Sequence, residues 1–113
     1  MLREMVEILF EGKGYAVLVT GNGKEAIELY NDRKNDVSLI LSDRDIPEIS
    51  GDRMFYEIQK IDSSVRVILA SGYIEFDKKS KLLKDGVKEV IQKPYKAVEI
   101  LERVRLVLDG QIS

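Results

Sequence analysis

Three side chains of the sequence, a carboxylate, a hydroxyl and an ammonium, stand where three apolar runs end. Asp43 closes the run LILSD, Ser71 follows VRVILA, and Lys93 follows VKEVIQ. A carboxylate can attack a phosphoryl group as a nucleophile and form an acyl phosphate. A hydroxyl can hydrogen-bond a phosphoryl oxygen, and an ammonium can neutralise the charge that the phosphoryl group brings. Together, the three residue types suit a site that accepts phosphoryl groups.

These side chains can meet only if the runs before them are parallel strands of one sheet. Short β-rich runs predict strands over residues 15–20, 37–41, 65–70 and 87–91. Helical spacing of apolar residues predicts helices over residues 2–11, 24–33, 52–61, 74–85 and 95–108. This alternation predicts an α/β fold, a doubly wound parallel sheet with helices on both faces. Such sheets bind ligands beyond the carboxyl ends of their strands. Asp43 alone could be a simple loop cap, but three polar residues at three strand ends favour a site.

Composition limits the classes of function. The 113 residues, 44% apolar and 34% charged, predict one domain over residues 1–113 with a core that needs no disulfide. A formal charge of −2 argues against nucleic acid as the main partner. The chain has no cysteine and no histidine, which removes thiolate catalysis and the usual general base. No apolar run is as long as a membrane span and no signal-peptide pattern is present, so we expect a cytoplasmic protein without membrane contact.

The motifs LILSDRDIPEISG, VRVILASGY and VKEVIQKPY occur in the order and at the spacing of a known family. The chain closely resembles the receiver domain of two-component response regulators, over essentially all of residues 1–109. The resemblance implies a flavodoxin-like fold and a signalling module rather than an enzyme. It also implies that Asp43 is the phosphoacceptor, Ser71 the switch hydroxyl and Lys93 the charge partner of the phosphoryl group. The Lys93–Pro94 bond is a candidate for the cis form.

The same resemblance implies partners. A histidine kinase or a phosphotransfer protein would supply the phosphoryl group, and another protein would read the result. The basic run from Lys78 to Lys84 has two interpretations, a docking patch or a solvated helix face. Tyr73, just after the Ser71-Gly72 pair, is a candidate partner contact. A flavin-binding function has no support, because no phosphate-cradling loop follows the first predicted strand.

The chain departs from the family at its start. The family begins with a strand that ends in two acidic residues, which hold Mg²⁺ beside the phosphoacceptor, whereas here nothing precedes the first helix. We therefore expect four strands and five helices, with the first strand of the family missing. Asp43 and the backbone carbonyl of Asp45 would form only an incomplete Mg²⁺ site, which predicts weak or absent binding. A second departure is Val90, at a position where many receivers have an aromatic ring.

The missing strand would lie between the runs 15–20 and 37–41. Buried backbone groups without partners are costly, so these two neighbours should pair with each other, take a strand from a second copy, or form a swapped dimer. A homodimer through the incomplete sheet is therefore one expectation. The main alternative to a working receiver is a degenerate receiver, a phosphorylation-independent module for protein interaction or dimerisation.

Overall fold

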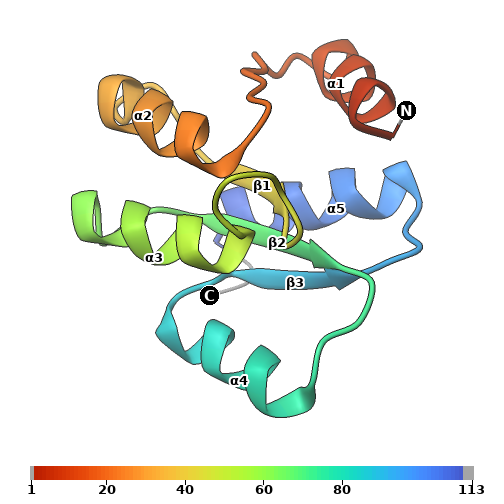
Figure 1. Ribbon diagram of the computed structural model, residues 1–113. Coiled ribbons are helices and arrows are strands. Elements are labelled where there is room, and N and C mark those ends of the chain that lie inside the picture. The colour runs from red at the N-terminus through yellow and green to blue at the C-terminus, as the bar shows by residue number, and fades with distance from the viewer. Residues whose placement is uncertain (1, 111–113) are drawn as a thin grey trace.

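The computed structural model describes residues 2–110, with side chains described from Glu7 onward, and contains one parallel sheet between two layers of helices (Figure 1). The strands, in their order across the sheet, are β1 (Ile40–Asp43), β2 (Val67–Ser71) and β3 (Glu89–Gln92). Both strand pairs are parallel. Their carboxyl ends therefore lie along one edge, as the sequence predicts. The chain ends of the predicted domain, residue 1 and residues 111–113, lie outside the described residues.

Five helices cover the sheet, as predicted. They are α1 (Leu2–Gly12), α2 (Gly23–Arg33), α3 (Gly51–Ile61), α4 (Phe76–Asp85) and α5 (Ala97–Leu108). Two of them begin with a side-chain cap, because Asn22 accepts a hydrogen bond from the Glu25 amide and Ser50 accepts one from the Arg53 amide. Within residues 2–110, no helix has the length and apolar character needed to cross a membrane.

The core has two halves, one on each face of the sheet. Along β2, Val67 and Leu69 pack with buried residues of α2, α3 and α4, whereas Ile68 packs with buried residues of α1 and α5. This alternation follows from the two-residue period of a strand. β2 is the central strand of the sheet, and all five of its residues are therefore buried. Burial of each large apolar side chain contributes roughly 1.5–3 kcal/mol, so this strand anchors both layers.

The strand predicted over residues 15–20 is wrong, and so is the count of four strands. Within the described residues, strand pairing joins only β1 with β2 and β2 with β3. Tyr15 and Val17 pack half-buried on the α1 and α5 side of the core, while Leu18 is 47% exposed. A β-rich run has only a preference for extended backbone, and a strand also needs a partner that completes its hydrogen-bond ladder.

As a result, β1 is an edge strand. Its four residues are all half-buried, in contrast to β2. The Ile40 amide donates to the Arg66 carbonyl and the Arg44 amide donates to the Ala70 carbonyl, at 2.8 and 2.9 Å. In a parallel ladder alternate residues face the same neighbour, so the backbone groups of Leu41 face away from β2. Of the outcomes expected for the incomplete sheet, pairing of residues 15–20 with β1 does not occur.

The predicted strands begin two or three residues too early and end one or two too early, because apolar runs extend into the loops that lead to the sheet. This shift matters for the site. Asp43 and Ser71 are the last residues of β1 and β2, held by the ladder itself. Lys93 is the first residue after β3.

Candidate functional site

The three predicted site residues lie at the same edge of the sheet. In the register of the strands, Asp43 is opposite Ala70, one residue before Ser71. The Lys93 amide donates to the Ser71 carbonyl at 2.8 Å, which fixes the turn after β3 against the end of β2. The Lys93–Pro94 peptide bond is cis, as predicted. The backbone thus positions all three residues at the end of the sheet.

Asp43 and Lys93 contact each other directly. The Lys93 Nζ atom lies 3.1 Å from Oδ1 of Asp43. The Asp43 side chain is 42% exposed, so a reactant can reach it from solvent. Among the described residues, none donates a hydrogen bond to Oδ2. The arrangement supplies a charge-compensated carboxylate with one oxygen available for attack on an electrophile.

Ser71 lies beside this pair but does not contact it. Its side chain is buried, and its hydroxyl donates to the Tyr73 carbonyl at 2.8 Å and accepts from the Arg44 Nη1 atom at 3.3 Å. Within the described chain, the hydroxyl forms no hydrogen bond with Asp43 or Lys93. The structure thus brings two of the predicted residues together and turns the third toward the β2–α4 loop.

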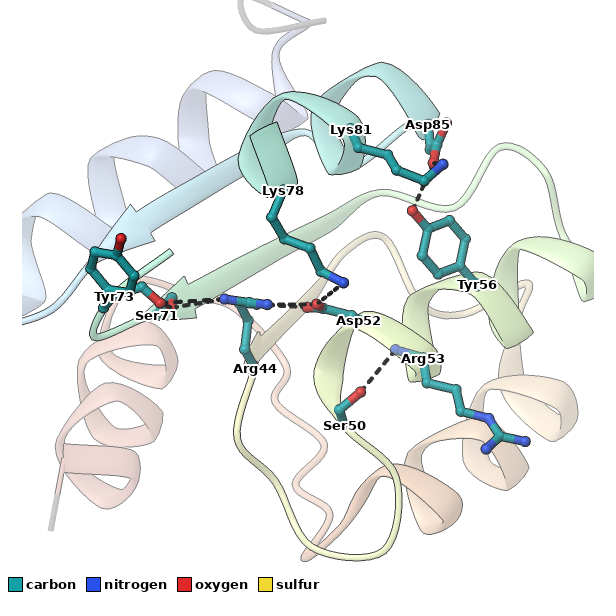
Figure 2. Close-up of polar contacts among 10 residues, drawn as sticks. All are labelled: Arg44, Ser50, Asp52, Arg53, Tyr56, Ser71, Tyr73, Lys78, Lys81 and Asp85. Atoms are coloured by element: carbon teal, nitrogen blue, oxygen red, sulfur yellow. Dashed lines mark hydrogen bonds and ion pairs between the residues drawn. The ribbon is translucent and has the colours of Figure 1, made fainter. Parts of the chain in front are cut away.

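An ion pair between Arg44 and Asp52 lies next to the site, and the sequence did not predict it. The Arg44 guanidinium donates two hydrogen bonds to the Asp52 carboxylate, from Nε to Oδ1 and from Nη2 to Oδ2, both 2.8 Å long (Figure 2). Hydrogen bonding to Asp52 raises the pKa of Arg44 above its usual value despite the opposing effect of burial. Lys78 of α4 lies 3.7 Å from the same carboxylate. The signal in the sequence is an arginine directly after a strand-end acid, with an acid in the first turn of the next helix.

Tyr95 is a second residue whose place near Asp43 the sequence did not reveal. It is half-buried, and burial is the main cause that raises its pKa. The negative charge of Asp43 is the second cause. The Tyr95 phenol therefore lies within electrostatic reach of Asp43.

The loop after Asp43 is held close to the backbone at the end of β1 by Gly51, the first residue of α3. The Gly51 amide donates to the Arg44 carbonyl at 2.8 Å. A Cβ atom on Gly51 would collide with the backbone carbonyl of Asp43 and come within 2.9 Å of the Arg44 Cα atom. Only glycine permits this approach without movement of the backbone, so Gly51 fixes how the β1–α3 loop folds back onto the strand end.

An open parallel sheet with helices on both faces and polar residues beyond the carboxyl ends of its strands is typical of the doubly wound, flavodoxin-like class of folds. The family model described as "Response regulator receiver domain" matches residues 1–105, and the chain belongs to that family. The sequence is 28% identical over 109 residues to the chemotaxis protein CheY of Bacillus subtilis, covering 96% of this chain and 89% of that protein.

Two further comparisons agree. The chain is 30% identical over 107 residues to the chemotaxis protein CheY of Thermotoga maritima, covering 94% of this chain and 88% of that protein. A receiver domain from Clostridium thermocellum has the same fold, with a TM-score of 0.86 at 23% identity, covering 96% of this chain and 86% of that one. The flavodoxin-like receiver fold that the motifs imply is therefore confirmed.

Receiver domains generally bind Mg²⁺, but the donors described in this chain do not complete such a site. The predicted donors are the carboxylate of Asp43 and the backbone carbonyl of Asp45, which is an exposed residue. No group of three or more His, Cys, Asp or Glu residues suited to a metal occurs within the described part of the chain. Mg²⁺ requires six oxygen ligands in near-octahedral geometry. These residues alone therefore fit the ion poorly.

Proposed function

We propose that this chain is a phosphoacceptor receiver domain, in which Asp43 accepts a phosphoryl group from a histidine kinase or a phosphotransfer protein. The observation that carries the proposal is the contact between Lys93 Nζ and Asp43 Oδ1, 3.1 Å, at the sheet edge where β2 presents Ser71. Membership of the receiver family supports it. The donor would meet this chain in the cytoplasm, the location that the sequence predicts.

The proposed step is a transfer of one phosphoryl group between two proteins. A carboxylate oxygen of Asp43 attacks the phosphorus of a phosphohistidine, a P–O bond forms, and the P–N bond breaks. The histidine nitrogen keeps the electron pair and takes up a proton. The product is an acyl phosphate on Asp43, and the Lys93 ammonium balances part of its added charge. The chain is the acceptor in this step, so its role is that of a signalling module.

A protein partner would read the phosphorylated state near the end of β2. Tyr73 is 77% exposed and Phe76 is 81% exposed, and both follow Ser71 closely in the β2–α4 region. Solvent-exposed aromatic side chains are enriched at protein interfaces. The slight negative charge of the chain favours a protein over nucleic acid as this partner.

A small phosphodonor tests the proposal. Incubation of the protein with acetyl phosphate and Mg²⁺, followed by intact-protein mass spectrometry, is expected to show one added phosphoryl group. The Asp43→Asn variant should show none, because its amide is not a nucleophile toward phosphorus. The exposed Asp45→Asn variant is the matched control and should still accept the group. An adduct that survives in Asp43→Asn, or the absence of any adduct on the unaltered protein, would contradict the proposal.

A second candidate function is a phosphorylation-independent interaction module, in which the chain forms a homodimer through its incomplete sheet. The specific observation in its favour is the outward-facing backbone of β1, an edge that no described strand covers. Edge strands of this kind pair readily with other chains. The incomplete set of Mg²⁺ donors also supports a degenerate receiver. A stable dimer without any phosphoryl adduct would favour this second function.

A further inference from the structure

Arg44 follows Asp43 directly but acts on the other side of the sheet. Successive residues of an extended segment point to opposite faces. Asp43 forms an ion pair with Lys93. Arg44 instead points toward α3, where it meets Asp52 (Figure 2). The two neighbours thus join the proposed phosphoacceptor to a separate polar cluster, formed by Arg44, Asp52, Ser71, Tyr73 and Lys78.

The Arg44 side chain is fixed in place by its anchor. Its side chain is 19% exposed and that of Asp52 is 12% exposed, so water screens the pair little. Two parallel hydrogen bonds between a guanidinium and a carboxylate hold the guanidinium plane in one orientation. The remaining nitrogen, Nη1, then points at Ser71 Oγ, 3.3 Å away, and at the Tyr73 carbonyl, 3.4 Å away. Arg44 therefore connects the start of α3 to the end of β2 and to the loop before α4.

The Ser71 hydroxyl is fully engaged in this cluster. It donates its proton to the Tyr73 carbonyl at 2.8 Å and accepts from Arg44. A hydroxyl has one proton to donate, and an acyl phosphate on Asp43 would need that proton for a hydrogen bond from Ser71. The hydroxyl cannot serve the Tyr73 carbonyl and a phosphoryl oxygen at the same time. The Ser71 hydroxyl can therefore donate to a phosphoryl oxygen only if its hydrogen bond to the Tyr73 carbonyl breaks.

We propose that Arg44 is a positioning residue that holds the Ser71 hydroxyl on the Tyr73 carbonyl and thereby opposes its engagement with a phosphoryl group on Asp43. The opposition to phosphoryl engagement, the second half of this inference, rests on the proposed phosphoacceptor function. The positioning of the Ser71 hydroxyl by Arg44, the first half, stands without it. Because Asp52 also contacts Lys78, the same anchor links the β2–α4 loop to α4. Release of Ser71 would leave Arg44 bound to Asp52, and the loop that carries Tyr73 would keep only its 3.4 Å contact with Arg44.

The first test needs no phosphorylation. In ¹⁵N-labelled protein, the Arg44→Gln variant is expected to shift the amide signals of Gly72 and Tyr73 and to increase their fast motions in ¹⁵N relaxation. Arg44→Lys keeps a positive charge beside Asp52 but lacks the planar guanidinium group, so it should increase the motions of the same two residues. This second variant keeps the test valid if Arg44→Gln does not fold. Arg53→Gln is the matched control, because the Arg53 side chain is exposed and points away from the cluster (Figure 2). Unchanged signals of Gly72 and Tyr73 in both Arg44 variants would overturn the positioning role.

The second test measures phosphorylation. The acetyl phosphate concentration that half-phosphorylates the protein is expected to fall about three- to tenfold in Arg44→Gln, the size of effect that the loss of one ordinary hydrogen bond produces. In a Ser71→Ala background the same Arg44 change should have no further effect, because the hydroxyl that it positions is gone.

The outcomes separate the two proposals. The opposing role of Arg44 would be overturned if half-phosphorylation of Arg44→Gln needed more acetyl phosphate than the unaltered protein, or the same concentration as Arg53→Gln. An Arg44 effect that persists with Ser71→Ala would overturn the route through Ser71. If the unaltered protein takes up no phosphoryl group, the proposed function and the second half of the inference fail together. The relaxation measurement on unphosphorylated protein then still decides whether Arg44 positions Ser71.

Discussion

Lys93 and Asp43 form an ion pair of 3.1 Å across the end of a strand that contains neither of them. Asp43 ends β1 and Lys93 follows β3, and β2 lies between these strands in the sheet. The pair therefore bridges over the strand end occupied by Ser71. Both side chains are substantially exposed, so their attraction is screened by water and contributes little to folding. The geometry favours a role in the chemistry of Asp43.

Replacement of Lys93 by methionine tests whether the ion pair serves folding or the chemistry of Asp43. We expect the free energy of unfolding to change by less than about 1 kcal/mol, as is usual for exposed ion pairs. Phosphorylation of Asp43 by acetyl phosphate should fall by at least about tenfold, because the charge of the acyl phosphate loses its partner. Urea denaturation and mass spectrometry give the two values. Lys60→Met, which breaks an exposed pair with Glu57, is the control and should leave phosphorylation unchanged. A large loss of stability in Lys93→Met with normal phosphorylation would assign the pair a structural role.

Replacement of Gly51 by alanine should disturb the site from the backbone side. The added Cβ atom collides with the carbonyl of Asp43, and the nearest atoms are backbone atoms that cannot rotate away. We expect a loss of about 1–3 kcal/mol in the free energy of unfolding. Shifted amide signals at Asp43 and Arg44 should accompany it. Gly12→Ala is the control, because its Cβ meets nothing within 4 Å, and it should not destabilise the protein. Equal stability of the two variants would contradict the close approach at Gly51.

The sequence predicts the location of the site better than its contacts. Three polar residues after three apolar runs were sufficient to place Asp43, Ser71 and Lys93 at one edge, because parallel strands necessarily share their carboxyl end. The orientation of the Ser71 hydroxyl could not be predicted. It depends on Arg44, which in turn depends on how the β1–α3 loop folds back to bring Asp52 into reach, and no spacing rule describes that loop.

The failed prediction over residues 15–20 has a similar cause. Tyr15 and Val17 alternate with exposed residues as in a half-buried strand, and the local pattern is therefore correct. A strand is a property of two segments, and the described chain provides no neighbour that pairs with this one. Local preference describes one segment and carries no information about its partner. For the same reason, no strand of the described chain pairs with the outer edge of β1.

Tyr30 gives a prediction for alkaline pH. Its hydroxyl donates to Asp62 at 2.8 Å, and burial, followed by this bond, raises the pKa of Tyr30 to about 12. Well below pH 10 the phenol is protonated in the folded and unfolded chains alike, so its contribution to stability is complete. Between about pH 10 and pH 12 the unfolded chain loses the proton first, and the contribution disappears.

Urea denaturation of the unaltered protein and Tyr30→Phe measures this effect. At about pH 8 the variant should be less stable by about 1 kcal/mol, the usual value of one hydrogen bond. At about pH 11 the difference should be smaller, since the phenylalanine cannot ionise. Tyr56, which donates to Asp85 and has a pKa raised to about 12 mainly by burial, should behave in the same way. A difference that stays constant between the two pH values would refute the raised pKa.

Mg²⁺ binding is expected to be weak or absent in this chain. Asp43 and the backbone carbonyl of Asp45 provide too few oxygen ligands for the octahedral shell that the ion prefers. A titration with MgCl₂, followed through the amide signals around Asp43, should show small shifts without saturation. Ca²⁺ at equal concentration controls for ionic strength. Saturation at low millimolar Mg²⁺ would mean that other residues complete the site.

The outer edge of β1, which pairs with no described strand, leads to the last prediction. If a second copy pairs with this edge, sedimentation velocity should show a concentration-dependent dimer, and the amide of Leu41, which faces away from β2, should exchange more slowly with solvent as concentration rises. The amide of Ile40, which already donates to the Arg66 carbonyl, is the internal reference and should change less. Pairing between edges protects outward-facing amides selectively, whereas association through a helix face would leave Leu41 unchanged. A monomer at all concentrations, with Leu41 exchange independent of concentration, would exclude this dimer and leave the phosphoacceptor role as the one function proposed for the chain.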